Sequence, residues 1–266
     1  MTDQDARTAL DLPTVIAELQ ARAWPGPIPT IVDTTESTNS DVALLATAGA
    51  PEGSCVVAEY QSAGRGRLDR QWVSPHSAGL WLSVLVRPSD MPRASWNWLP
   101  LLAGLATARA IRAVTGVMAE VKWPNDLVVV DHSSRKLGGI LSEVHGDDAV
   151  VVGIGLNVST AKAELPIAAA TSVSLEGGSA NREALFAAVL AGFSECLERW
   201  RLDDPELKVE YRALCASIGR VVEATMPDSV IVRGLVLDVD NDGHLLVDDG
   251  TTTVMVTTGD VIHATI

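Results

Sequence analysis

The sequence predicts an α+β protein in which a large domain of strands and helices precedes a small all-β domain. Between residues 30 and 216, apolar runs typical of buried strands stand beside apolar residues at helical spacing. From Arg220 onward the chain contains only short β-type runs separated by Asp, Asn and Gly turns, a pattern typical of a small barrel or sandwich. Ser217-Ile218-Gly219 marks the change, so we predict a catalytic domain over 1–216 and a β domain over 217–266.

The helices are predicted from apolar residues three and four positions apart and from residues that begin or end helices. Pro25 ends the first helix, Ser95 is expected to cap the third, Gly116 closes it, and Asn181 caps the fourth. The predicted helices are Thr14–Trp24, a helix through Val42, Leu45 and Ala46 to Gly49, Trp96–Val114, Arg182–Trp200 and Pro205–Cys215.

The strands are predicted from short runs rich in β-branched and other apolar residues, bounded by polar turns. In the first domain the predicted strands are Thr30–Val32, Ser54–Tyr60, Leu80–Val86, Val117–Lys122, Leu127–Val130, Gly138–Val144 and Val150–Leu156. In the second domain they are Val221–Ala224, Val230–Val239, Leu245–Val247, Thr253–Val256 and Val261–His263.

Composition narrows the classes of protein to which the chain can belong. No apolar run reaches the length of a membrane span, and the acidic start does not resemble a secretory signal. The three cysteines, Cys55, Cys196 and Cys215, are an odd number without metal-ligand spacing. We therefore expect reduced thiols in a cytoplasmic protein that does not bind membranes.

The charge of the chain is unevenly distributed. The chain has 20 Lys and Arg residues and 34 Asp and Glu residues, which gives a net charge of −14. Arg65, Arg67 and Arg70 nevertheless fall within six residues, offset only by Asp69. A local cationic loop on an acidic body suits a small polyanion such as a nucleotide better than DNA.

Several segments that follow strands carry residues suited to chemistry. Gly64-Arg65-Gly66-Arg67 offers backbone N–H groups and guanidinium ions to phosphate or carboxylate oxygens. Lys122-Trp123-Pro124-Asn125-Asp126 presents an amine beside a rigid turn, and Lys136-Leu137-Gly138-Gly139-Ile140 leaves room for a flat ligand. Gly155-Leu156-Asn157 again places a polar amide at a strand end. Each segment alone fits an ordinary solvated turn equally well.

As an ordered set, these segments and Ser37-Thr38-Asn39 with Gln61 resemble the motifs of the biotin protein ligase family. The resemblance covers roughly Thr30 to Ile266. It implies a class II aminoacyl-tRNA synthetase-like mixed sheet with helices, followed by an SH3-like β domain. It also implies a ligase that activates biotin with ATP and transfers it to a lysine of a biotin carboxyl carrier domain of acyl-CoA carboxylases.

The resemblance implies a role for each matching residue. Lys136, Lys122 and Arg67 would be catalytic, since two anions must meet and cations would screen their charge. The residues that would bind biotin are Ser37, Thr38, Asn39, Gln61, Arg65, Gly66, Arg67, Lys136, Gly138, Gly139 and Gly155. Those that would bind ATP or the adenylate are Arg67, Arg70, Trp72, Lys122, Asn125 and Asn157, with Trp72 near adenine and Mg²⁺ carried by ATP rather than by a protein site.

Two departures from the family pattern concern the site. Leu68-Asp69 interrupt the Arg/Gly loop before Arg70, and the turn Asp131–Arg135 before Lys136 is longer than usual. We further expect the loop Gly64–Trp72 to be mobile without ligand and to close over the adenylate, because its like charges repel each other.

The same residues allow three other interpretations, each of which is disfavoured. A lipoate ligase or octanoyltransferase would share the fold, but a transferase needs a thiol nucleophile, and no cysteine lies near Lys122 or Lys136 in sequence. A DNA-binding repressor needs an N-terminal domain, for which about thirty residues before the first strand are too few. The run from Asp238 to Asp249 mimics a calcium loop, but its β-type flanks favour a hairpin turn.

Overall fold

The computed structural model describes residues 7–68, 70–130, 134–226, 230–257 and 259–263. Seven strands form one mixed sheet in the order β1-β2-β3-β7-β6-β5-β4. The first two strands are parallel, and the other neighbouring pairs are antiparallel. The strands are β1 (Thr30–Thr35), β2 (Cys55–Gln61), β3 (Gly79–Val86), β4 (Ala119–Lys122), β5 (Asp126–Val130), β6 (Ser134–His145) and β7 (Ala149–Asn157). The α+β class and every strand predicted for this region are confirmed, with ends shifted by a few residues.

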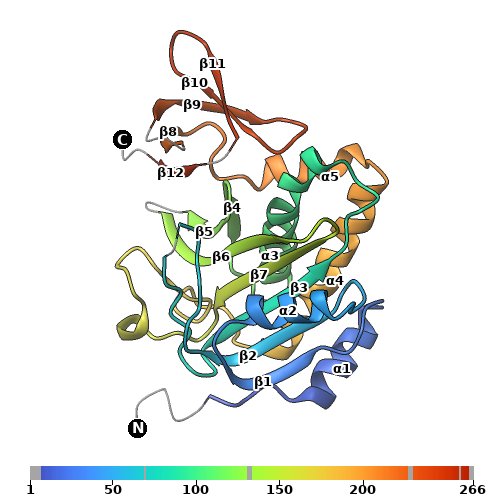
Figure 1. Cartoon of the computed structure of the whole chain (residues 1–266). Helices are drawn as coiled ribbons and strands as arrows, with labels where there is room; N and C mark the ends of the chain where they lie inside the picture. Colours follow the sequence, from blue (N-terminus) through green and yellow to red (C-terminus); the bar gives the residue numbers. More distant parts are fainter. Residues whose placement is uncertain (1–6, 69, 131–133, 227–229, 258, 264–266) are drawn as a thin grey trace.

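Helices cover both faces of this sheet (Figure 1). α3 (Trp98–Thr115) packs on β4–β7, and α4 (Arg182–Arg201) packs on α3. α2 (Thr38–Thr47) lies on the opposite face against β2, β3 and β7, while α1 (Leu12–Ala21) and α5 (Pro205–Ala213) contact α4. The buried apolar residues form two clusters: the larger includes Trp98 and Phe186, and the smaller, under α2, includes Val42 and Val151.

The ends of the helices follow local rules with one exception. Gly116 ends α3 with a φ of 77°, and the Asn181 side chain accepts a hydrogen bond from Ala184 N at the start of α4. The prediction that Ser95 caps α3 is wrong. Residues Arg93–Asn97 form a 3-10 turn, η2, inside which the Ser95 hydroxyl donates to Pro92 O, so that α3 begins only at Trp98.

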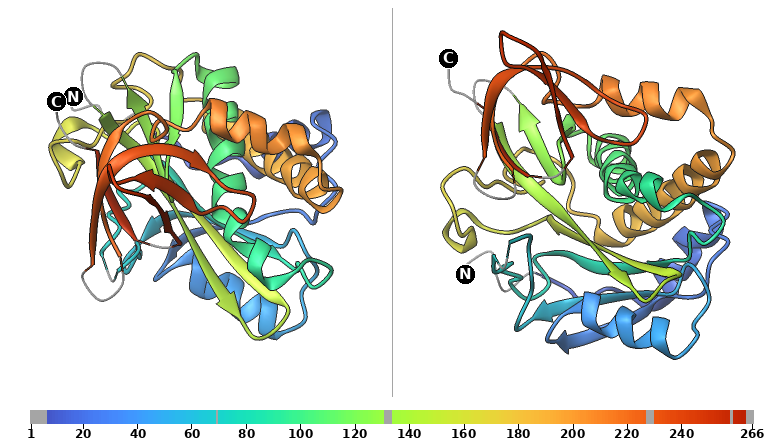
Figure 2. Two further views of the ribbon diagram at one scale, coloured as in Figure 1. Left: turned by 90° about the horizontal axis from the view of Figure 1, so that it is seen from above. Right: turned by 45° about the horizontal axis from the view of Figure 1, so that its top comes forward.

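The C-terminal sheet is antiparallel, with the strand order β11-β10-β9-β8-β12. Its strands are β8 (Val221–Thr225), β9 (Ile231–Val239), β10 (Leu245–Asp248), β11 (Thr253–Val256) and β12 (Asp260–His263). Figures 1 and 2 show that it lies over the β4–β5 end of the large sheet. The prediction of five short strands after Arg220 is confirmed.

Two indole N–H groups, one on α3 and one in the turn after β4, bind the turn between β9 and β10 of the C-terminal sheet. Trp98 Nε1 donates to Asn241 O at 2.7 Å, and Trp123 Nε1 donates to Gly243 O at 3.0 Å. The Ser217 hydroxyl accepts from Trp123 N and lies 3.1 Å from His263 Nε2. Trp123 is therefore held through its backbone by Ser217 and through its side chain by Gly243.

The N-terminal segment is fixed by a buried ion pair. Arg182, on α4, and Glu59, on β2, lie 2.7 Å apart with side chains only 6% and 2% exposed. Glu59 also accepts from Leu10 N, and Arg182 also donates to Thr8 O and Gly79 O. Every polar atom of the pair thus finds partners, which a buried charge requires.

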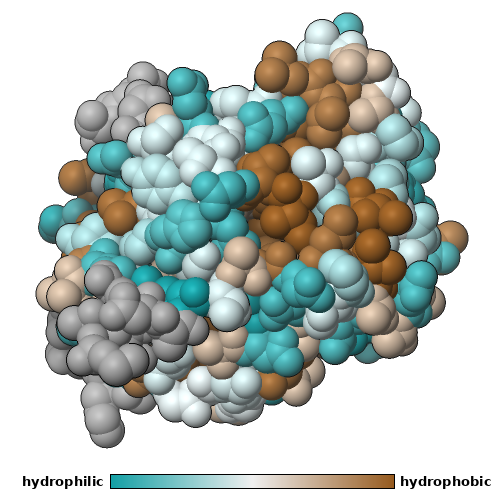
Figure 3. Space-filling view, turned by 90° about the horizontal axis from the view of Figure 1, so that it is seen from below, coloured by the Kyte–Doolittle hydropathy of each residue, from teal (hydrophilic) through white to brown (hydrophobic). Residues whose placement is uncertain are grey.

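Figure 3 shows apolar surface on the side of the molecule that is seen from below. Large apolar side chains that are exposed include Ile28, just before the edge strand β1, at 64%, and Leu44, on α2, at 71%. Among the described helices, none has the length and apolar character needed to cross a lipid bilayer.

Candidate active site

A cavity of about 250 Å³ opens where β2 and β7 end and β6 begins, near the loops that follow β2 and β7. The two loops lie at the same end of the sheet in Figure 1, coloured teal and yellow. The cavity brings together most of the residues that the sequence singled out. Of the predicted site residues, those that line it are Ser37, Thr38, Asn39, Gln61, Arg65, Gly66, Arg67, Arg70, Trp72, Asn125, Lys136, Gly139, Gly155 and Asn157.

One end of the cavity is a network of buried uncharged polar groups at the start of α2. Gln61 Oε1 accepts from Thr38 N at 2.9 Å, and Gln61 Nε2 donates to the Ser74 hydroxyl at 3.1 Å. Thr38 and Asn39 are 3% and 5% exposed, and both bond to Ser83, which is fully buried on β3. Neutral groups held in this way suit a small uncharged heterocycle with its own donors and acceptors.

The Gly/Arg loop forms a small closed hairpin over the cavity. Gly66 N donates to Arg70 O at 2.7 Å, and Trp72 N donates to Gly64 O at 2.8 Å. A side chain at Gly64 would lie 2.6 Å from Trp72 O, so only glycine fits there. Leu68 adopts a φ of 55° at the tip, a conformation that a branched residue rarely takes.

Two arginines of this loop bind groups on other elements. Arg65 NH2 lies 2.9 Å from Glu143 Oε2, and NH1 donates to the Ser40 hydroxyl. Arg67 donates to Asn125 Oδ1 at 3.1 Å and to Gly259 O, which belongs to the segment just before β12. The loop is therefore tied both to the large sheet and to the C-terminal sheet.

Trp72 fills the space that the glycines of β6 and β7 leave open. A side chain at Gly155 would lie 2.6 Å from Trp72 Cε2, and one at Gly139 would lie 3.6 Å from the ring. The indole also packs edge-on against Trp81, with ring centroids 6.1 Å apart. The flat group against these strands is thus the protein's own indole, which forms a wall of the cavity.

Lys136 lies at the other end of the cavity, where its Nζ is 2.6 Å from Asp126 Oδ1. The two side chains are 29% and 23% exposed, so the pair remains open to the cavity. Lys136 N donates to Ala169 O, and Lys136 O accepts from Thr171 N, which fixes its backbone on both sides. An ammonium ion held in this position can stabilise oxygens that become more negative during a reaction.

Two predicted site residues, Lys122 and Gly138, do not line the cavity. Lys122 ends β4 close to His263, where its charge and that of Arg220 add to burial in lowering the pKa of the imidazole to about 4. Gly138 points away from the cavity, and a side chain there would collide with Gly155 O. Its role is therefore to let β6 and β7 approach each other.

Asn157 and the loop after β7 form a further wall. Asn157 Nδ2 donates to Thr171 O at 3.0 Å, and Pro166, Ile167 and Ala170 line the cavity beside it. The loop is anchored by Glu164, which forms an ion pair with Arg7 at 2.6 Å with both side chains largely buried. The N-terminal segment thus supports a wall of the cavity.

Sequence reasoning missed three polar residues of the site: Asp126, which lines the cavity, and Ser83 and Glu143, which lie behind it. Signals for two of them were present. Ser83 is the only polar residue in the otherwise apolar run of β3. Glu143 shares a strand face with Gly139, since residues two and four apart on a strand point to the same side.

No described cysteine is suited to act as a nucleophile at the cavity. All three cysteines are free and buried. Burial raises the pKa of the Cys196 thiol to about 12 and also raises the pKa of the Cys55 and Cys215 thiols. A protonated, buried thiol is a poor nucleophile, which disfavours the octanoyltransferase alternative.

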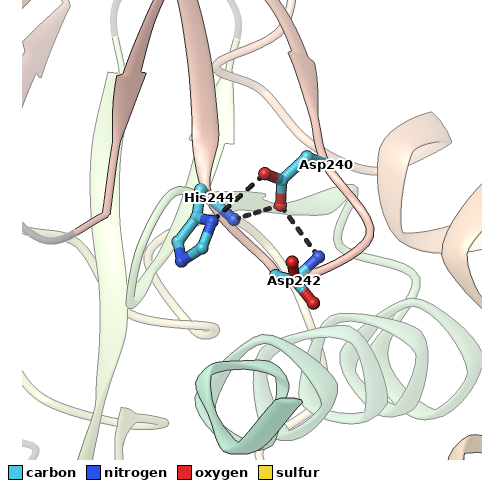
Figure 4. A group of neighbouring side chains, drawn as sticks. All are labelled: Asp240, Asp242 and His244. Atoms are coloured by element: carbon cyan, nitrogen blue, oxygen red, sulfur yellow. Dashed lines mark hydrogen bonds and ion pairs between the residues drawn. The ribbon is translucent and has the colours of Figure 1, made fainter. Parts of the chain in front are cut away.

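The acidic run near residue 240 forms a turn between β9 and β10, as predicted (Figure 4). Asp240 accepts from Asp242 N at 2.8 Å and from His244 N at 2.9 Å, and its other oxygen lies 3.1 Å from His244 Nδ1. The carboxylate that a cation would need is therefore already used by the hairpin.

Comparisons with known proteins give family matches for both parts of the chain. The sequence profile of the Biotin/lipoate A/B protein ligase family matches residues 31–159, and that of the Biotin protein ligase C terminal domain matches residues 217–264. The chain is 38% identical over 237 residues to the biotin–[acetyl-CoA-carboxylase] ligase of Mycobacterium tuberculosis, covering 88% of each protein. It is 31% identical to the bifunctional ligase/repressor BirA of Bacillus subtilis, covering 81% of this chain and 68% of that protein.

The fold is also similar to solved structures. The biotin protein ligase from Aquifex aeolicus in complex with biotin and ATP superposes with a TM-score of 0.77 at 25% sequence identity. That similarity covers 89% of this chain and 99% of the other.

Proposed function

Because the chain belongs to the biotin protein ligase family, we propose that it activates biotin with ATP and transfers it to a lysine of a biotin carboxyl carrier domain of acyl-CoA carboxylases. The observation that carries this proposal is the cavity itself. A neutral hydrogen-bonding end at Thr38 and Gln61 is separated from a cationic end at Lys136 by the indole wall of Trp72. Biotin has the same polarity, since a neutral ureido ring stands at one end and a carboxylate at the other.

In the first step the biotin carboxylate attacks the α-phosphorus of ATP. A new P–O bond forms, the bond to the leaving pyrophosphate breaks, and biotinyl-5′-AMP remains. Because two anions must approach each other, we propose that Lys136 and Arg67 screen their charge and orient the reacting oxygens. Arg70, which lines the same cavity, would assist at the phosphates.

In the second step the neutral amine of the carrier lysine attacks the acyl carbon of the adenylate. The bond to the phosphate oxygen breaks, AMP leaves, and the amine loses a proton as the amide forms. No covalent intermediate on this protein is needed, which agrees with the buried state of its thiols.

The magnesium ion would enter with ATP and not occupy a site of the protein's own. Asn125 and Asp126 line the cavity where it would arrive, but their Oδ1 atoms already bond to Arg67 and Lys136. When bound, the ion would add positive charge at the phosphates. Asn157 and Trp72 would contact the nucleotide, whereas Ser37, Thr38, Asn39 and Gln61 would hold the ureido ring.

We further propose that residues 1–216 form the catalytic domain and residues 217–266 the second domain. The unpaired cysteines support a cytoplasmic location, and the net charge of −14 supports a protein that does not bind DNA.

The proposed function is tested by ATP–pyrophosphate exchange, followed by transfer of labelled biotin to a purified carboxylase carrier domain. We expect exchange with biotin and ATP alone, before any carrier is added, and label on the carrier only when ATP is present. Exchange that needed the carrier, or that proceeded equally well with lipoate, would contradict the proposal.

A further inference from the structure

In the hydrogen bonds behind the neutral end of the cavity, each group's role as donor or acceptor follows from that of its neighbour. Glu143 is the first group of this series. Glu143 Oε2 accepts from Asn39 Nδ2 at 2.6 Å and from Arg65 NH2 at 2.9 Å. A carboxylate has no proton to donate, so the amide of Asn39 must turn its nitrogen towards Glu143. Leu141 O, at the longer distance of 3.3 Å, accepts from the same nitrogen.

The orientation of Asn39 then decides where the proton of Ser83 goes. With Nδ2 facing Glu143, Asn39 Oδ1 faces the Ser83 hydroxyl at 2.6 Å and can only accept. Ser83 has a single hydroxyl proton, which this bond uses. Its oxygen lies 2.7 Å from Thr38 Oγ1 and must therefore act as the acceptor there.

The proton of Thr38 is consequently also used inside the protein. Thr38 Oγ1 donates either to Ser83 or to Gln61 Oε1, which lies at 3.2 Å. In both cases the Thr38 oxygen offers only lone pairs to a ligand in the cavity. Asn39 and Ser83 are 5% and 0% exposed, so water has little access to the chain of bonds that sets this direction.

We propose that Glu143, acting through Asn39 and Ser83, makes Thr38 a hydrogen-bond acceptor and thereby selects a ligand that presents a ring N–H at this point. Glu143 is a positioning residue for specificity, and its role rests on the proposed function. The ureido ring of biotin has two N–H donors and one carbonyl. Ser37, which lines the cavity and makes no capping bond to α2, can donate to that carbonyl.

A simpler role for Glu143 would be to hold the Gly/Arg loop through Arg65. The two roles differ in what Glu143→Gln does. An amide can still accept from Arg65, but it can also donate to Asn39, so that only the longer bond to Leu141 O still holds the Asn39 nitrogen in its place. If Asn39 turns round, Ser83 donates to Thr38, and Thr38 can then donate either to Gln61 Oε1 or to the ligand.

The test compares biotin with two carbamate analogues, in which oxygen replaces one or the other ring N–H. In the wild-type protein we expect the analogue that sets its oxygen against Thr38 to bind about a hundredfold more weakly than biotin, because two acceptors would then face each other. In Glu143→Gln this ratio should fall to about tenfold or less, while the KM for ATP stays within roughly twofold. The readouts are binding by calorimetry and biotin-dependent pyrophosphate exchange.

The matched control is Glu120→Gln, on β4. The Glu120 side chain is 32% exposed, against 33% for Glu143, and it pairs with Arg112 at 3.9 Å outside the cavity. This variant should keep the wild-type ratio.

A double variant provides the rescue. Asn39→Asp with Glu143→Gln exchanges the amide and the carboxylate across their contact, so the new carboxylate again accepts from Ser83. We expect it to recover a ratio at least threefold above that of Glu143→Gln alone, on the scale of about one hydrogen bond. Loop support through Arg65 predicts no such recovery.

Several outcomes overturn the proposal. If the wild-type protein binds both analogues as tightly as it binds biotin, the proposal is overturned. This outcome does not depend on whether any variant folds. A Glu143→Gln variant that melts normally and keeps the full ratio assigns Glu143 to loop support alone. If pyrophosphate exchange in the wild type does not depend on biotin, the proposed function is overturned as well. Biotin dependence of exchange in the wild type therefore distinguishes failure of the proposed function from failure of the role of Glu143.

Discussion

Replacing Lys136 by alanine separates a role in the reaction from a role in folding. The Lys136 ammonium lies 2.6 Å from Asp126, and both side chains are partly exposed, at 29% and 23%. Ion pairs with this degree of exposure contribute only about 0.5–1 kcal/mol to stability, because water and salt screen them. For a chain of this size we expect Lys136→Ala to lower Tm by roughly 2–4 °C.

The effect on the reaction should be much larger. A positioned cation that faces developing negative charge in a cavity contributes about 2–4 kcal/mol to transition-state stabilisation. Its loss should slow biotinyl-adenylate formation roughly thirtyfold to a thousandfold. The difference between the two energies makes the role of Lys136 measurable.

The assay is biotin-dependent ATP–pyrophosphate exchange, with thermal melting measured on the same samples. Lys208→Ala is the matched control, since Lys208 also pairs with an aspartate, at 3.5 Å, and its side chain is 20% exposed far from the cavity. The control should exchange at the wild-type rate. Near-wild-type exchange in a normally melting Lys136→Ala protein would refute the assignment.

Three further results are expected. Gly155→Ala should displace the Trp72 indole, which would lie 2.6 Å from the added carbon. Calorimetry should then show that biotin binds about tenfold or more weakly. Unchanged affinity would mean that biotin binding does not need the indole wall. Trypsin should cut within Gly64–Trp72 readily in the free protein and slowly with biotin plus ATP, whereas equal rates despite confirmed binding would exclude closure of the loop. Burial, with Lys122 and Arg220 nearby, lowers the pKa of His263 to about 4, below its unfolded value of about 6.5, so its contribution to stability is complete above pH 6.5 and is lost as the pH falls towards 4. Denaturant melts of wild type and His263→Gln should converge at low pH; parallel curves would contradict this.

The sequence by itself was enough to predict most of the helices and strands and the family. Periodicity located the strands of both sheets, because alternation and apolar runs are local properties of the chain. It placed the start of α3 two residues early, at Trp96 and not at Trp98, since a 3-10 turn often precedes the first turn of an α-helix and continues into it. The ordered motifs also brought most predicted ligand-binding residues to one cavity.

Only the tertiary structure decided which way these residues face and what stands behind them. Gly138 and Gly139 are neighbours in a glycine pair, yet they point to opposite faces of β6, so only Gly139 lines the cavity. Lys122 follows its strand to the C-terminal sheet instead of the cavity. Glu143, on β6, reaches Asn39, on α2, from a position 104 residues away, and no local pattern records a contact between elements that only the fold brings together.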